Sequence, residues 1–252
     1  MDFSLTPEEL ATYEWQLAVP GFGAAQQAKL KAATVMVSRV GGVGGAAAMY
    51  LAAAGVGKLI LAHGGRLEPS DLNRQTLMKH AWIGRSRVEC AAASLRELNP
   101  RLEVEALAEH ITEANVVGLV AQADLVVDAA PRFDERLRLN RACVQLGKPM
   151  VESAMYELQL TVTTFIPGQT PCLACLHPET PPLWERKFPV LGAVAGVAGA
   201  LAAMEAIKVL TDLGTPLAGR MFLQDLRDGS ARTVELLRDP SCRECAAASP
   251  RF

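Results

Sequence analysis

The sequence lacks an excess of charge of either sign, because 25 Lys and Arg residues against 27 Asp and Glu residues leave a net charge of -2 at pH 7. Bulk charge therefore offers no attraction to nucleic acid or to an anionic membrane, and partners must be recognised locally. Only 21% of the 252 residues are charged and 50% are hydrophobic, which supports a sizeable core. Internal repeats and low-complexity tracts are also missing.

The segment MDFSLTPEELATYEWQ at residues 1–16 lacks the apolar stretch of a secretory signal peptide and contains acidic residues. A cytoplasmic location is the resulting expectation. The most apolar stretch, residues 190–210, is nearly long enough to span a bilayer, but it is rich in Ala and Gly and contains Glu205 and Lys208. We therefore expect a helix buried inside the protein and no membrane contact.

Helical and extended patterns alternate through the first part of the chain. Thr6 and Pro7 predict the start of a short N-terminal helix, and residues 23–32 a second one. Extended segments are expected at residues 34–38, 58–62, 102–107 and 124–128, and helices at residues 42–54, 86–98, 112–122 and 133–146. This alternation is typical of a parallel sheet covered on both faces.

After Pro149 the pattern changes to β segments at residues 150–168 and 219–238, the second with Asp228-Gly229 as a hairpin turn. Residues 177–189 are rich in proline and predict a surface loop. The expected fold class is α/β, with a Rossmann-like mixed sheet that is parallel in its first half and antiparallel in its second. We predict one domain over residues 1–252, divided into N-terminal helices at 1–33, a nucleotide-binding-type half at 34–150 and an antiparallel, zinc-bearing half at 151–252.

Four of the six cysteines form two CxxC pairs, Cys172 with Cys175 and Cys242 with Cys245. Each pair can present two thiolates on one tight turn, and two such pairs make a closed tetrahedral zinc site with a structural role. Disulfides are the weaker explanation in a chain expected to be cytosolic, and redox chemistry or accidental surface thiols are the remaining alternatives. The other two cysteines lie in apolar helical patterns and are expected in the core.

Residues 37–65, VSRVGGVGGAAAMYLAAAGVGKLILAHGG, predict a strand, a glycine-rich turn, an apolar helix and a second strand. A nucleotide-binding unit begins in this way, because the glycines let the backbone approach a phosphate at the start of the helix. Arg39 stands where such a loop needs its first glycine. The loop therefore indicates a nucleotide site, an altered one, or a fold that no longer binds a nucleotide.

Several stretches in order, from about residue 17 to residue 245, resemble the ThiF/MoeB/HesA adenylyltransferases, relatives of the ubiquitin-activating enzymes. They include GGVGGAAAMYLAAAGVGKL, SDLNRQTL, GRSRVECAAASLRELNP, DLVVDAA, PCLAC, GVAGALAAMEAIKVL and DPSCREC. The resemblance implies a nucleotide-binding α/β domain that forms a homodimer and carries a four-cysteine zinc. It also implies that ATP, usually with magnesium, adenylates the C-terminal glycine of a ubiquitin-like sulfur carrier.

The resemblance carries a partial set of nucleotide-binding residues onto this chain. If the site is retained, these residues are Gly41, Gly42, Gly44, Asp71, Arg74, Gln75 and Arg87. Asp71 stands in place of an asparagine, and Arg87 in place of a lysine. The positions that differ from the family are Arg39 for the first glycine, His63 and Gly65 for two aspartates, Pro131 for a magnesium-linked aspartate, and Trp15 for an arginine supplied across the dimer.

Several of these residues also have plainer interpretations. Arg39 either projects to the surface or fills the phosphate site with its own charge, and His63 is more simply a hydrogen-bonded structural histidine. Trp15 and Trp184 contact a dimer partner or a peptide, or pack on their own domain. Asp128, Asp134 and Glu135 are candidates to replace the missing carboxylate, although ordinary strand-end and first-turn acids explain them as well.

The altered positions favour a degenerate or repurposed relative that binds a ubiquitin-like carrier tail or another partner and uses ATP and magnesium weakly or not at all. The alternative is an active adenylyltransferase that activates the C-terminal glycine of a sulfur carrier in the molybdopterin or thiamine pathway. An oxidoreductase using nicotinamide or flavin is disfavoured, because His63 replaces the acid that would hold an adenosine ribose. No catalytic residue is identified, so enzymatic activity is left open.

Overall fold

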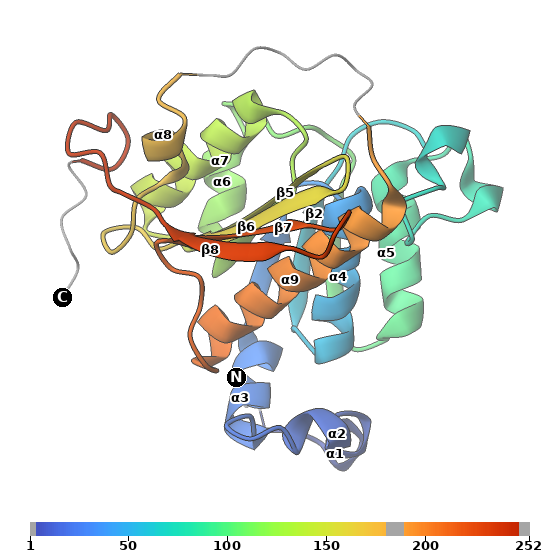
Figure 1. Cartoon of the computed structure of the whole chain (residues 1–252). Helices are drawn as coiled ribbons and strands as arrows, with labels where there is room; N and C mark the ends of the chain where they lie inside the picture. Colours follow the sequence, from blue (N-terminus) through green and yellow to red (C-terminus); the bar gives the residue numbers. More distant parts are fainter. Residues whose placement is uncertain (1–3, 180–188, 247–252) are drawn as a thin grey trace.

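The computed structural model describes residues 4–179 and 189–246, and it is built on one eight-stranded sheet (Figure 1). The strand order is β3-β2-β1-β4-β5-β6-β7-β8. β1 to β5 pair in parallel and β5 to β8 pair antiparallel, which confirms the predicted mixed sheet. The strands are β1 Thr34–Val37, β2 Lys58–Ala62, β3 Glu103–Leu107, β4 Leu125–Asp128, β5 Met150–Tyr156, β6 Gln159–Phe165, β7 Arg220–Asp225 and β8 Ala231–Glu235.

Helices cover both faces of the parallel half of the sheet. Figure 1 shows α4, α5 and α9 on one face and α6 and α7 on the other. Val35 and Val37 of β1 belong to the core on the first face, whereas Met36 belongs to the core on the second. In the described part of the chain the α-helices are α1 Pro7–Thr12, α2 Glu14–Leu17, α3 Ala24–Ala32, α4 Gly42–Ala54, α5 Arg87–Leu98, α6 Val116–Ala121, α7 Phe133–Leu146, α8 Leu173–Leu176 and α9 Gly192–Thr211.

The long apolar helix α9 has the length and composition of a membrane span, and it is the one helix in the described residues that does. It packs against α4 and against β5 and β6. Gly199 permits this close approach, because a Cβ at that position would lie 2.2 Å from the carbonyl oxygen of Val43 in α4. These contacts agree with the prediction of a helix packed inside the protein.

Capping and turn residues explain where some of the helices and strands begin or end. The predicted N-terminal helix begins with a capping box, in which Thr6 Oγ1 accepts from the Glu9 amide and the Glu9 carboxylate accepts from the Thr6 amide. The predicted Asp228-Gly229 turn joins β7 to β8, with Gly229 at a φ of 78°.

Two segments differ from the prediction or cannot be compared with it. The helix expected at residues 112–122 is shorter, Val116–Ala121, because the Asn115 side chain accepts from the Thr112 amide at 2.8 Å and donates to the His110 carbonyl at 3.0 Å. These bonds form a turn that competes with a helical start. Most of the expected loop at 177–189, including Trp184, lies outside the described residues.

Candidate functional site

A cavity of about 970 Å³ opens at the carboxyl ends of β1, β2 and β4. The chain runs from β1 outward to β2 and β3 and then returns to place β4 on the other side of β1, so the strand order reverses at this point. Ligands of open α/β sheets bind at such a reversal. The cavity is lined by Arg39, Gly41, Gly42, Val43, His63, Glu68, Ser70, Asp71, Asn73, Arg74, Gln75, Arg87, Ala129, Ala130, Pro131, Arg136, Ser153, Ala154, Met155, Val190 and Ala195.

The glycine-rich turn brings the first residues of α4 to this cavity. Gly41 and Gly42 line it, and Gly44 lies just behind them. A Cβ at Gly44 would lie 1.7 Å from the carbonyl oxygen of Arg39, so no larger residue fits this turn as it stands. The free amides at the start of a helix favour an anion, which makes this end of the cavity suited to phosphate.

Arg39 lies along the wall of the cavity and is paired with Glu135 at the start of α7. Its Nε donates to Glu135 Oε1 at 2.9 Å and to Oε2 at 3.1 Å, and its Nη2 also contacts Oε2. The side chains are 15% and 4% exposed, respectively. Arg39 therefore neither extends into solvent nor stands as an unpaired charge, and the cavity beside it is open.

Asp71 organises the opposite wall through both of its carboxylate oxygens. Oδ1 accepts from Gln75 Nε2 at 2.8 Å and from Arg74 Nη2 at 3.3 Å. Oδ2 accepts from the Glu68 amide at 3.0 Å and pairs with Arg87 Nη2 at 2.7 Å. Two arginines thus share one buried carboxylate, and the exposed Glu68 is the second acidic residue of this wall.

His63 follows β2 and is buried in the wall between these two groups. Burial, with added repulsion from the nearby Arg39, Arg87 and His110, lowers the pKa of His63 to about 3. The imidazole is therefore neutral at physiological pH. Its Nδ1 is buried without a hydrogen-bond partner in the described part of the chain. The other altered position of this strand end, Gly65, has a φ of 91°, a conformation that favours glycine.

Two buried acids lie behind the cavity, at neighbouring positions of β4 and β5. Asp128 pairs in register with Glu152, and Arg136 contacts Glu152 and lies 3.7 Å from Asp128 Oδ2. Burial raises the pKa of both carboxyls, that of Glu152 to about 7. Our sequence reasoning missed Glu152 and Arg136, although a glutamate within a buried strand was a signal that could have found them.

The three carboxylates considered as replacements at Pro131 are each held elsewhere. Asp128 is fully buried, with Oδ1 accepting from the Ala130 amide at 3.0 Å. Asp134 pairs with Arg132 at 3.3 Å and with Arg138 at 3.3 Å. Glu135 holds Arg39. None of the three is among the residues that line the cavity, whereas Pro131 is.

A second, more apolar cavity of about 230 Å³ adjoins the first. It lies over the antiparallel strands and is lined by Pro131, Phe133, Arg136, Ala154, Met155, Tyr156, Gln159, Leu160 and Thr161. Pro131, Arg136, Ala154 and Met155 belong to both cavities. The two spaces therefore meet beside Arg136.

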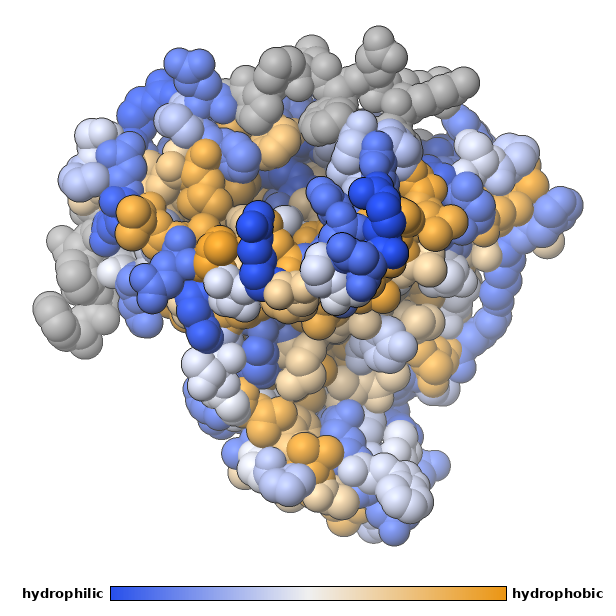
Figure 2. Space-filling view, viewed as in Figure 1, coloured by the Kyte–Doolittle hydropathy of each residue, from blue (hydrophilic) through white to orange (hydrophobic). Residues whose placement is uncertain are grey.

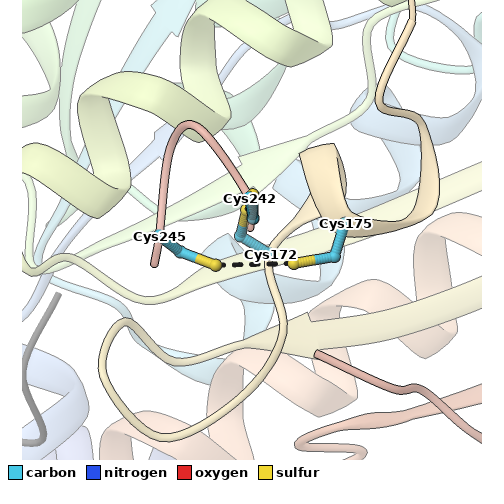
Figure 3. Close-up of side chains that lie close together, drawn as sticks. All are labelled: Cys172, Cys175, Cys242 and Cys245. Carbon is cyan, nitrogen blue, oxygen red and sulfur yellow. Dashed lines mark hydrogen bonds between the residues drawn. The ribbon is translucent and has the colours of Figure 1, made fainter. Parts of the chain in front are cut away.

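The four predicted cysteine ligands come together at the other end of the antiparallel half (Figure 3). Their sulfur atoms all lie within 4.8 Å of one another, with 3.7 Å between Cys172 and Cys242 and 3.4 Å between Cys175 and Cys245. A tetrahedral ion with Zn–S bonds of about 2.3 Å separates its sulfurs by about 3.8 Å, so the cluster fits a metal ion.

Asn140 of α7 braces the first CxxC turn. Its Oδ1 accepts from the Leu173 amide at 2.8 Å, and its Nδ2 donates to Cys172 Sγ at 3.6 Å. Burial raises the pKa of the Cys172 thiol, so a bound cation has to displace protons to hold thiolates there. The cluster joins residues near 245 to the middle of the chain. Cys90 and Cys143 are buried and separate from it.

Trp15 lies on α2 and is 88% exposed, so in a single copy of the chain it does not pack on its own domain. It is not among the residues that line either cavity. The side chain is therefore available to a partner.

Comparison with known proteins identifies a matching family and several relatives of this chain. The ThiF family model matches residues 13–244. Protein HesA, heterocyst, of Trichormus variabilis is 47% identical over 247 residues, which cover 98% of this chain and 92% of that protein. The sulfur carrier protein adenylyltransferase of Thermus thermophilus is 38% identical over 249 residues, which cover 95% of this chain and 92% of that relative.

Among solved structures, E. coli MccB with MccA-N7isoASN has a TM-score of 0.85 at 22% identity, covering 96% of this chain and 76% of that one. A likeness at this identity shows a shared fold. The family match, by contrast, runs through the glycine turn and every segment that lines the two cavities. The resemblance found in the sequence is thus confirmed, and the chain belongs to the ThiF family.

Proposed function

We propose that this protein binds a nucleotide in the larger cavity and uses it to activate the C-terminal carboxylate of a small carrier protein or peptide. The observation that carries the proposal is the junction of two cavities with different chemistry. The larger one offers four arginines and the start of α4, which suit phosphates. The smaller one offers a mostly apolar channel of the kind that holds an extended peptide.

In this reaction a carboxylate oxygen of the tail attacks the α-phosphorus of the nucleotide. A bond forms between that oxygen and the phosphorus, while the bond from the phosphorus to pyrophosphate breaks and pyrophosphate leaves with the electron pair. Both reactants are anions, so cationic groups must reduce their repulsion. Arg136 lies where the cavities meet, and Arg74 and Arg87 add positive charge on the adjoining wall. The relative named a sulfur carrier protein adenylyltransferase supports this class of reaction.

Carrier-dependent exchange of labelled pyrophosphate into ATP tests the proposal, with a ubiquitin-like carrier ending in Gly-Gly as substrate. Thr161→Trp fills the smaller cavity and should abolish the carrier-dependent part of exchange while nucleotide binding persists. Thr233→Trp is the matched control, because Thr233 lies on the exposed strand β8 outside both cavities. Exchange that proceeds equally in both variants would contradict the assignment of the tail to this channel.

A second candidate function is the binding of a carrier tail or partner without turnover, as the sequence analysis favours. The specific observation behind it is Pro131, which lines both cavities where the family resemblance implies an aspartate. Carrier binding that shows no pyrophosphate exchange under any condition would select this second function. Exchange by the unmodified chain would exclude it.

We also propose zinc as the ion of the cysteine cluster and a homodimer as the assembly. Four thiolate ligands leave no open coordination position, so the metal would serve the fold. Exposed apolar side chains on α4 and α9, namely Tyr50, Val197 and Met204, support a dimer interface, and exposed Trp15 adds to it. Figure 2 shows apolar surface along this side of the molecule. Sedimentation at micromolar concentration distinguishes a dimer from a monomer.

A further inference from the structure

The acidic residues around the larger cavity are not arranged to hold a divalent metal. Magnesium needs oxygen ligands that are free to coordinate it, usually one or two carboxylates together with phosphates. Both oxygens of Asp71 already accept hydrogen bonds, from Gln75 and Arg74 on one side and from the Glu68 amide and Arg87 on the other. The carboxylate of Glu135 is covered by Arg39.

The position that the resemblance assigns to a magnesium-linked aspartate cannot serve either, because Pro131 has no side-chain oxygen. Asp128 and Asp134 are held away from the lining by the contacts described above. Glu68, an exposed residue, is the other acidic residue on the wall. The aspartate that the resemblance links to magnesium therefore has no replacement in the described lining other than the exposed Glu68.

A guanidinium of fixed orientation lies on the wall opposite Asp71. Glu135 holds Arg39 through Nε and Nη2, and no hydrogen bond among the described residues uses Nη1. The guanidinium therefore keeps both N–H groups of Nη1 for a ligand, in an orientation set by the ion pair. An anchored guanidinium loses less side-chain freedom when it binds phosphate than a free one does. The neutral His63 also lines the cavity.

We propose that Arg39, anchored by Glu135, binds the polyphosphate of the cavity's ligand through its unused Nη1, so that binding does not require a divalent metal. The inference rests on the proposed nucleotide function and adds to it the hydrogen-bond donors that hold the phosphates. Arg39 is accordingly a phosphate-binding residue, and Glu135 is the residue that positions it. Glu135 keeps the guanidinium against the wall and thereby keeps the cavity open.

The test is calorimetric titration of the full chain with ATP and with inorganic tripolyphosphate, each in EDTA and in magnesium. We expect both ligands to bind in EDTA. Arg39→Gln combined with Glu135→Gln should weaken that binding by about tenfold to a hundredfold, because a charge-assisted contact is lost. The double substitution removes both members of the ion pair, so no lone buried carboxylate is left to unfold the protein.

Arg132→Gln is the matched control, because Arg132 precedes α7 next to Pro131 but does not line the cavity. This variant should bind both ligands as the unmodified chain does.

The outcomes distinguish the role of Arg39 from the proposed nucleotide function. Metal-free binding of tripolyphosphate but not of ATP supports the role of Arg39 and overturns the nucleotide function. Binding that needs magnesium, is lost in Glu68→Gln and is unchanged in the double variant overturns the role of Arg39 and leaves the nucleotide function in place. No binding of either ligand with or without magnesium overturns both.

Discussion

The cysteine cluster and the arginine-lined cavity are both assembled from distant segments, but they depend on their surroundings to different degrees. Four cysteine side chains on two CxxC turns are suited to coordinate one metal ion once they come together, whatever residues surround them. The charge that each arginine contributes to the cavity depends instead on its ion-pair partner. Arg39 is neutralised by Glu135, whereas Arg74 and Arg87 share Asp71. Spacing in the sequence can therefore predict a metal site, but it cannot assign the net charge of an ion-paired pocket.

The largest expected effect comes from breaking the cysteine cluster. Cys242→Ser should abolish the metal binding that we propose for the cluster and lower the free energy of unfolding by on the order of 5 kcal/mol, because metal binding stabilises only the folded chain. Metal analysis and denaturant unfolding measure the two effects. Cys90→Ala is the control, since this cysteine is buried outside the cluster and should leave the metal content unchanged. A Cys242→Ser protein with full metal content would show that the cluster is not the metal site.

The second prediction concerns the glycine-rich turn at the edge of the larger cavity. Gly44→Ala should destabilise the chain by about 3 kcal/mol and weaken polyphosphate binding, because its Cβ would collide with the Arg39 carbonyl and displace the turn. Gly118→Ala is the matched control on α6, where a Cβ meets nothing within 4 Å. That substitution should be neutral or stabilising by up to about 1 kcal/mol, since alanine favours a helix. Equal effects of the two substitutions on stability would contradict the close packing of the glycine turn.

The smallest effect concerns the acids behind the cavity. Burial raises the pKa of Glu152 from 4.5 to about 7, so the unfolded chain loses this proton at a lower pH than the folded chain does. The contribution of Glu152 to stability is therefore greatest below about pH 4.5, falls as the pH rises to about 7, and then levels off, with a total change of up to about 3 kcal/mol.

Glu152→Gln should remove this part of the pH dependence, which denaturant unfolding between pH 4 and pH 8 measures. Glu109→Gln is the control, because Glu109 is exposed and distant from the two buried acids. Parallel pH curves for the unmodified chain and Glu152→Gln would mean that the buried pair does not hold its proton as the structure indicates.

Much of the fold was predictable from local patterns. The helix at residues 42–54 and the strand at 58–62 have the predicted bounds, because apolar periodicity and the flanking glycines agree there. Residues 112–122 were predicted less well, since the hydrogen bonds of Asn115 delay the helix and leave no trace in hydrophobic periodicity. Asp71, Arg74 and Gln75, which the family resemblance had assigned to a nucleotide site, do line the cavity wall.

The family, the order of the elements and the four clustered cysteines follow from residue types and their spacing along continuous stretches. The surroundings of the altered positions depend on contacts between segments that are far apart in the sequence. Arg39 and Glu135 are 96 residues apart, and nothing in either segment indicates that one neutralises the other. Glu152 of β5 and Arg136 of α7 likewise become an ion pair only when the fold brings α7 to β5. Electrostatic energy depends on distance and burial, which arise when the sheet forms, and therefore the chemistry of the cavity could not be read from the residues one at a time.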